Sequence, residues 1–389
     1  MIVELNPTFS AQGRTVSIPA TEINVFTSSV VRDNINQYQS RFGVFGFMGL
    51  NDRMKFTITK LTGTPFMWQP VSHCTWTPTG NLSITKDSIT PSEAMIQEEF
   101  CQDELVNSMF AQFLATNNRG LSPEGQRIFN QVVTKITEQA TLGAWLTLTI
   151  GKLYDPTTVN FKDGTDATIE SLFSKTIGTV RGWVELLKEM AASEARFRHL
   201  NIPAFSTDEF DGDRYLGDPV ALFDKLYDAA PSELSNLIDE GGVPSTLGTS
   251  SVLFIVSTSI FRQVAALYRK QGTEIITLRP RLTQKDVSGI TVYYLDDIPI
   301  IPVSYISHMD AYLKGKQHFA ALTLSGNIQL GTSFGAVPNV NAPNVGIIMQ
   351  QKTNLDELGR VLMRADSLFT TAIADHRYIC AAQVFVEAA

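Results

Sequence analysis

Two adjacent carboxylates, Asp296 and Asp297, are the residues of this sequence whose types and spacing come closest to a reactive site. Such a pair could hold a metal ion, or could divide into a general acid and a general base. Together with His308 it would form an active site assembled from dispersed residues. An Asp-Asp pair between two β-rich runs is also typical of a turn, and we prefer that interpretation.

The other reactive groups do not follow the spacings that chemistry requires. No two of the five histidines are four residues apart, the spacing that lets two imidazoles share a zinc ion on one helix face. No two of the three cysteines have the two-residue separation that clasps a metal. These residues are His73, His199, His308, His318, His376, Cys74, Cys101 and Cys380.

Loops that bind calcium or phosphate are also missing their defining residues. The acidic run 208–213 resembles the start of a calcium loop, but Pro219 occupies the position of the closing glutamate. A phosphate-binding loop needs a glycine five residues before its Gly-Lys pair, and Leu146 and Asp310 stand there before Gly151 and Gly315. We therefore predict a protein without catalysis, metal or cofactor, whose role is contact.

The composition is that of a folded chain of two or three domains. Of its 389 residues, 43% are hydrophobic and 18% are charged, so it has enough apolar surface for a large core. The net charge of −8 argues against a broad phosphate-binding face, because nonspecific affinity for nucleic acid comes from basic residues. No apolar stretch reaches the roughly 18 residues that a membrane span requires, and we expect a soluble protein without a signal peptide.

A buried strand that leads into a capped helix is the clearest element, over 251–270, and it ends at Gly272. The turn at Ser257-Thr258-Ser259 lacks the glycines that let backbone approach a phosphate. Two β-rich runs follow over 290–303, on either side of the two aspartates. The densest basic group is either a solvated helix face or a site for an acidic partner, and it comprises Arg262, Arg269, Lys270, Arg279 and Arg281.

The first 46 residues show no sustained helical period, and we expect an extended strip. Its apolar side chains must lie against a neighbouring subunit, which we favour, or against the chain's own body. Two β-rich runs, 55–61 and 81–85, then predict a hairpin-like excursion. Thr90-Pro-Ser-Glu93 is a capping box that predicts a helix toward Ala115.

Further helices are predicted from Ser122, over 169–191 as one long amphipathic helix, and from Asp218-Pro219 through Tyr227. Residues 325–346, rich in Gly, Asn and Pro, predict a long loop. The pattern leaves helix or strand open over 355–374 and predicts a terminal strand over 377–386.

This order of elements resembles the major capsid proteins of tailed bacteriophages, with the Hong Kong 97-type fold that encapsulins share. The resemblance is carried by the strip to 46, the excursion 54–87, the long helices, the strand–helix 252–271, and the runs Asp296-Asp-Ile-Pro-Ile-Ile-Pro302 and Arg377–Glu387. It implies an α+β fold with an extended N-terminal arm, a β-hairpin E-loop, a peripheral domain with a long spine helix, and an axial α/β domain. Covalent cross-linking residues have no motif in this sequence.

The implied division is an arm over 1–46, an E-loop over 47–89, a peripheral domain over 90–200, an axial domain over 201–344, and a return to the peripheral domain over 345–389. The implied function is self-assembly, as pentamers and hexamers, into an icosahedral shell around a double-stranded DNA phage genome. Portal, scaffolding and decoration proteins would be partners, and the virion, assembled in the host bacterial cytoplasm, would be its location.

We expect the contacts between subunits to be anchored by aromatic side chains of the arm and the excursion, since aromatic residues dominate desolvated interface cores. The candidates are Phe26, Phe66, Trp68 and Trp76. Two alternatives stay open: an encapsulin-like compartment that loads enzyme cargo, and an α/β enzyme with the dispersed site described above.

Overall fold

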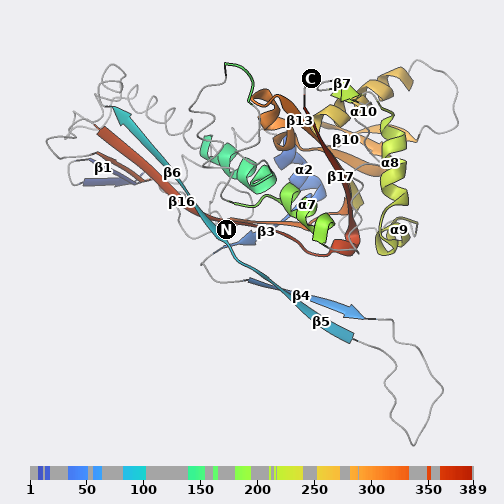
Figure 1. The fold of residues 1–389 in the computed structure, drawn as a ribbon, viewed down its shortest axis with the longest axis horizontal. Coiled ribbons are helices and arrows are strands. Elements are labelled where there is room, and N and C mark those ends of the chain that lie inside the picture. The colour runs from blue at the N-terminus through green and yellow to red at the C-terminus, as the bar shows by residue number, and fades with distance from the viewer. Residues whose placement is uncertain are drawn as a thin grey trace, which may run out of the picture.

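The computed structural model has an α+β architecture, which confirms the predicted class. It describes residues 8–11, 14–17, 34–50, 56–63, 82–101, 139–153, 161–164, 180–193, 210–211, 214–215, 217–239, 252–271, 281–287, 289–332, 348–351 and 360–387. A body with two sheets carries a thin hairpin and a long strand ladder that both project from it (Figure 1).

A six-stranded sheet with the strand order β10-β11-β12-β9-β13-β17 is the centre of the body. Only the β12–β9 pair is parallel. The strands are β9 (Val252–Val256), β10 (Leu282–Val287), β11 (Ile290–Leu295), β12 (Ile298–Pro302), β13 (Gly315–Leu324) and β17 (Ile379–Glu387).

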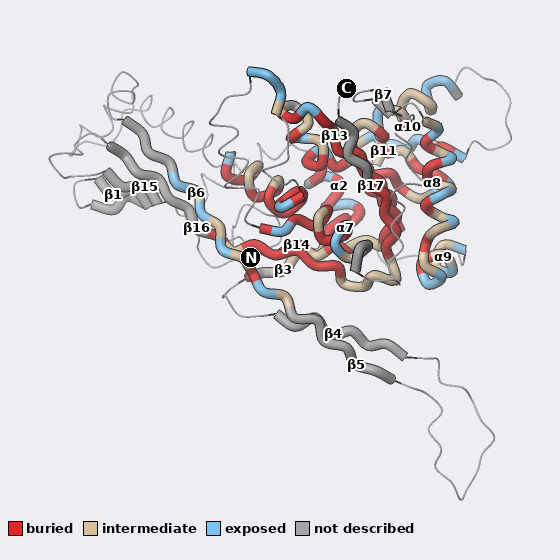
Figure 2. Tube along the Cα trace, viewed as in Figure 1, coloured by how far each residue is buried: buried red, intermediate tan, exposed pale blue. Residues whose placement is uncertain are grey.

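Both faces of this sheet are buried, because successive residues of its strands enter two different cores. Leu253 and Ile255 of β9 belong to one core, and Val252, Phe254 and Val256 belong to the other. The second core is closed by α8 (Pro219–Asp228), α9 (Ser232–Asp239) and α10 (Thr258–Gln271). Figure 2 shows the buried residues concentrated in this body.

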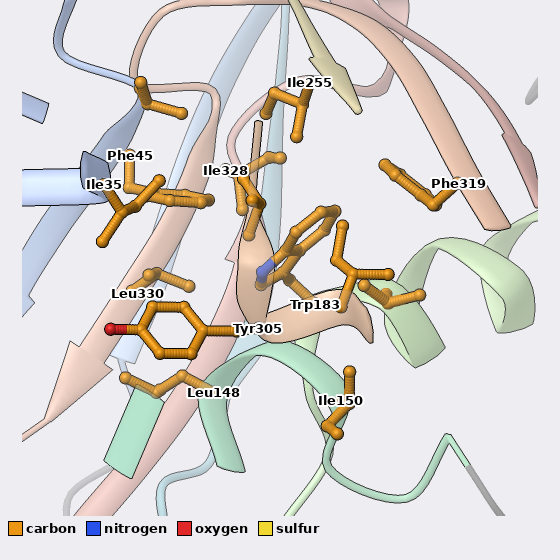
Figure 3. Close-up of a cluster of buried hydrophobic side chains, with 14 of the residues drawn as sticks. Ile35, Phe45, Leu148, Ile150, Trp183, Ile255, Tyr305, Phe319, Ile328 and Leu330 are labelled. Carbon is orange, nitrogen blue, oxygen red and sulfur yellow. The ribbon is translucent and has the colours of Figure 1, made fainter. Parts of the chain in front are cut away.

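The first core lies on the opposite face, beneath α2 (Asn34–Phe42), the helical residues 139–150, α7 (Trp183–Ser193) and the 3₁₀ helix η3 (Ser304–Ala311). Two tryptophans are fully buried in it. Trp145 stacks on Tyr305 with ring centroids 5.5 Å apart. Trp183 meets Phe319 edge-on at 5.2 Å, and Figure 3 shows these two side chains.

A second sheet of seven strands is organised around β16 (Arg360–Ile373). β6 (Ser92–Cys101) pairs with one edge of β16 over its whole length. The other edge of β16 pairs first with β15 (Ile348–Gln351) and then with β14 (Ile328–Thr332). The outer strands are β1 (Thr8–Ala11) and β2 (Arg14–Ser17) beyond β15, and β3 (Phe45–Gly49) beyond β14.

Two of the crossings of the chain between the two sheets lie side by side. One leads from β13 to β14, and the other from β16 through η5 (His376–Tyr378) to β17. Asn327 joins them: its amide donates to the backbone carbonyls of Asp375 and Tyr378 and accepts from the Asp375 backbone N–H, at 2.8–3.2 Å. We call these contacts the Asn327 joint.

Two smaller hairpins complete the described structure. β4 (Phe56–Gly63) pairs with β5 (Leu82–Ile89), and β7 (Phe210–Asp211) pairs with β8 (Arg214–Tyr215). The second hairpin occupies the acidic run that resembles a calcium loop.

Several predicted elements are confirmed. The buried strand and capped helix are β9 and α10, and the β4–β5 hairpin lies where an excursion is predicted. Asp218 caps α8, because its carboxylate accepts from the Val220 N–H at 2.9 Å. Asp296 and Asp297 form the turn between β11 and β12, with φ angles of 47° and 67°.

The helix predicted from the capping box at Thr90 is wrong, because residues 92–101 form strand β6. Its side chains alternate with a period of two. Ala94 and Ile96 pack against the first core, whereas Glu93, Met95 and Gln97 are exposed. Pairing with β16 outweighs the local capping signal.

The extended strip over 1–46 is also wrong in part. α2 is a helix whose Ile35, Tyr38 and Phe42 are buried in the first core. β1 and β2 form a hairpin that pairs with β15 of the same chain, so this part lies against the chain's own body, which was the alternative to the neighbouring subunit that we favoured.

The single helix predicted over 169–191 does not include residues 180–182, and α7 begins only at Trp183. Gly182 approaches the end of the preceding helix closely there, and its N–H donates to the Gly151 carbonyl at 2.7 Å. Val180, Val184 and Leu187 are nevertheless buried, as the apolar pattern predicts. Residues 169–179 lie outside the described part of the chain.

The long loop predicted over 325–346 begins with strand β14. The ambiguous segment 355–374 is resolved as a strand, since 360–373 are β16. The predicted boundary at 344/345 does not coincide with a change of sheet. The chain enters the seven-stranded sheet already at β14, which pairs with β16, and it returns to the six-stranded sheet only at β17, which pairs with β13. The division into peripheral and axial domains stays a prediction.

Candidate assembly surfaces

The β4–β5 hairpin is anchored at its base and projects away from the body (Figure 1). The chain leaves the body after Leu50, which is fully buried, and returns to it at Pro91, which is also buried. Between these points the pairing runs from Phe56 opposite Ile89 to Gly63 opposite Leu82. Among the described strands, β4 and β5 pair only with each other.

The four residues predicted as anchors between subunits, Phe26, Phe66, Trp68 and Trp76, lie outside the described residues. Their role therefore stays a prediction. The other two tryptophans, Trp145 and Trp183, are core residues with no exposed surface.

The β6–β16 ladder is the second projecting surface. β16 has 14 residues, which corresponds to a length of about 45 Å. The far ends of β6 and β16 extend beyond the body, beside β15 and the β1–β2 hairpin (Figure 1). Met95, on the outward side of β6, has 58% of its surface exposed, which is unusual for a large apolar side chain in a described strand.

Asp296 and Asp297, the aspartates of the alternative active site, form exposed ion pairs. Arg281 binds the carboxylates of both Asp224 and Asp296 at 2.7–3.0 Å, and the Asp297 carboxylate meets the Lys285 ammonium at 2.8 Å. The hydrogen bonds to Asp224 and Asp296 raise the pKa of Arg281. The two aspartates therefore close a turn and tie it to α8.

Among the residues that the structure describes, a serine–histidine contact resembles catalytic machinery. The Ser259 hydroxyl lies 2.7 Å from His318 Nδ1, and Ser257 Oγ lies 3.1 Å from Ser259 Oγ. His318 is only 1% exposed, and Ser257 Oγ also accepts the Phe319 N–H. The contact links the start of α10 to β13.

Sequence reasoning missed both this contact and the Asn327 joint. Their partners are 59 and 48 residues apart in the chain, so no local pattern announces them. Among the residues that the structure describes, no three His, Cys, Asp or Glu side chains gather as a metal site would require. Within the same residues, no helix is long and apolar enough to cross a membrane.

No protein-family model matches the chain, and no curated protein matches it. Solved structures with a similar fold include phage capsids and an encapsulin. The satellite phage P4 procapsid including size determination protein is similar over 93% of this chain and 97% of that chain, with 12% identity and a TM-score of 0.46.

A structure from Gordonia phage Cozz is similar over 89% of this chain and 85% of that chain, with 12% identity and a TM-score of 0.46. The holo-SrpI encapsulin complex of Synechococcus elongatus is similar over 87% and 84%, with 8% identity and a TM-score of 0.37. Because these TM-scores are below 0.5, the function proposed below is based on the geometry of this chain.

Proposed function

We propose that this protein is the major capsid protein of a tailed bacteriophage, which self-assembles into an icosahedral shell around double-stranded DNA. One observation carries the proposal. The β4–β5 hairpin joins the core only at its base and projects from the body, and within the described strands its two strands pair only with each other. A ribbon of this kind is marginally stable in water, so the surface of another copy is what would hold it in place.

The finer assignments follow from the same geometry. The β4–β5 hairpin would act as the E-loop, and the six-stranded sheet with α8, α9 and α10 would form the axial domain. The β6–β16 ladder would belong to the peripheral domain, and the residues before α2 would be the arm. Phe26 of the arm and Phe66, Trp68 and Trp76 of the E-loop would be the contact anchors between subunits.

A shell subunit of this design has no need of catalysis, and we propose a structural role alone. Several moderate contacts per copy, each adaptable, suit rings of five and six, where subunit surroundings differ slightly. Assembly in the host cytoplasm, with portal, scaffolding and decoration proteins as partners, is part of the same proposal.

The proposal is tested by removing the hairpin. Phe56 and Ile89 are directly opposite each other, so a short Gly-Ser linker between them can replace residues 57–88 without straining the body. We expect this variant to keep the circular dichroism spectrum of the wild type and to elute as a small species, whereas the wild type elutes as pentamers, hexamers or complete particles.

The matched control keeps the hairpin and replaces Lys60 and Lys86 by arginine, which should leave assembly unchanged. Electron micrographs that show normal particles from the hairpin-deleted variant would contradict the proposal.

A further inference from the structure

A row of basic residues lies on the outward side of α10. Arg262, Arg269 and Lys270 are exposed, and their spacing of seven and eight residues places them along one side of the helix. Ile260 and Val264, on the opposite side, are fully buried in the second core. We call Arg262, Arg269 and Lys270 the basic face.

The dipole of α10 does not account for all the cations of the basic face. Arg269 and Lys270 lie in the last turn, where cations are favoured by the helix dipole, but Arg262 lies in the N-terminal half and gains nothing from it. Neither Arg262 nor Arg269 forms an ion pair with any described residue. In a chain with a net charge of −8, such a concentration of cations indicates an acidic partner.

An acidic surface lies at the ends of the two neighbouring helices. Asp228 is the last residue of α8 and Asp239 is the last residue of α9, and both are exposed. An anion at a helix C-terminus is locally unfavourable, because the dipole places negative charge there. The helix dipole therefore does not explain these charges.

Tyr227 brings the two aspartates together. Its hydroxyl donates to the Asp239 carboxylate, and it lies next to Asp228 in α8. The hydrogen bond to Asp239, then burial, then the charges of Asp239 and Asp228 raise the pKa of Tyr227 to about 12. We call Asp228 and Asp239 the acidic corner.

The helices α8, α9 and α10 lie at the end of the molecule opposite the far ends of β6 and β16 (Figure 1). Two complementary surfaces of one chain can meet in a two-fold contact or in a head-to-tail contact, and only the head-to-tail contact repeats around a ring. The proposed shell is built from rings of five and six, which selects the head-to-tail contact.

We propose that the basic face on α10 of one copy binds the acidic corner of α8 and α9 of the next copy around a ring. The inference rests on the proposed shell function and names the surface through which neighbouring copies meet at this end. Contacts of this kind set the orientation and rate of association more than the final affinity, and salt weakens them.

The test uses charge reversal in the full-length chain. We expect R262E/R269E and D228K/D239K each to slow assembly at least tenfold at 0.1 M salt, as followed by light scattering. Combining all four substitutions restores the complementarity and should return the rate to within about threefold of the wild type. R41E/K152E reverses two exposed cations elsewhere and should have no effect.

Mixing supplies a second measurement. R262E/R269E and D228K/D239K can bind each other on both sides only if they alternate, which a ring of six allows and a ring of five forbids. An equimolar mixture should therefore form hexamers and no pentamers in native mass spectra.

The possible results separate the two proposals. If the wild type assembles and both reversed variants assemble at the wild-type rate, the contact is overturned while the shell function stands. The contact would also be overturned if the variant with all four substitutions assembles as slowly as the two double variants while its melting temperature equals that of the wild type. A wild type that remains monomeric would contradict the shell function, and this contact with it.

Discussion

Asn327 is the residue on which the connection between the two sheets depends most. It is 5% exposed, and its side chain bonds to three backbone groups of the crossing that leads into β17. Without this side chain the Asp375 N–H would lose its partner, whereas the Asp375 carbonyl would keep the Tyr378 N–H and the Tyr378 carbonyl would keep the Thr323 hydroxyl.

We therefore predict that Asn327→Ala lowers the free energy of unfolding by about 1–3 kcal/mol, the cost of leaving one partly buried donor unsatisfied. Urea denaturation measures the change. Ser40→Ala is the control: it removes an exposed hydroxyl that bonds to the Gln37 carbonyl, and it should change the stability by less than about 0.5 kcal/mol. Equal stability of the two variants would show that the joint is not needed.

Asp375, in the same joint, makes part of the stability depend on pH. Burial raises the pKa of its carboxyl, but the hydrogen bonds and charge of Arg377 outweigh burial and hold the pKa below its ordinary value. A carboxyl with a lowered pKa stabilises the fold above its unfolded-state pKa, and this contribution is lost as the pH falls through the folded-state pKa.

We expect Asp375→Asn to lower stability at pH 7 and to reduce the loss of stability of the wild type below about pH 4, near the pKa of an unfolded aspartate. Denaturation curves between pH 7 and pH 3 measure this difference. If stability falls with pH in the same way for the two proteins, Asp375 is not the source of this pH dependence.

At the scale of elements, the approach of two helix ends decides where α7 begins. Gly151, after the helical residues 139–150, and Gly182, before α7, meet backbone to backbone. A methyl group on Gly151 would collide with the carbonyl oxygens of Val180 and Thr147, and backbone atoms cannot turn aside as a side chain can.

We predict that Gly151→Ala destabilises the protein by about 3 kcal/mol, the upper range for overpacking. Gly143→Ala, in the same helix, meets no atom within 4 Å and should stabilise it by about 0.5–1 kcal/mol, since alanine is the better helix former. Thermal melts of both variants test this contrast, and destabilisation by Gly143→Ala would refute it.

At the scale of the whole molecule, α2 belongs to the body. Ile35, Tyr38 and Phe42 of α2 are at most 6% exposed and belong to the first core. Removing α2 would therefore open this core.

We expect deletion of residues 1–33 to leave a body that melts cooperatively but assembles poorly, because the arm would contribute contacts between copies. Deletion of residues 1–42 should abolish the cooperative melt. Circular dichroism and sedimentation measure the two effects, and normal particles from the shorter deletion would show that the arm is dispensable.

The sequence alone determined the elements whose signals are local. The apolar run of β9, the cap of α8 at Asp218 and the Asp296-Asp297 turn depend on residues that are neighbours in the chain, and all three were predicted correctly. The hairpin at 56–89 was predicted for the same reason, since each of its strands is β-rich and its partner is close.

Only the tertiary structure decided the elements whose partners are distant. A capping box at Thr90 favoured a helix, but pairing with β16, more than 250 residues later, makes the segment a strand. The Asn327 joint and the meeting of Gly151 with Gly182 arise the same way, because a backbone group is satisfied by whatever the fold brings beside it. Local preferences are worth less than the long-range pairing that opposes them.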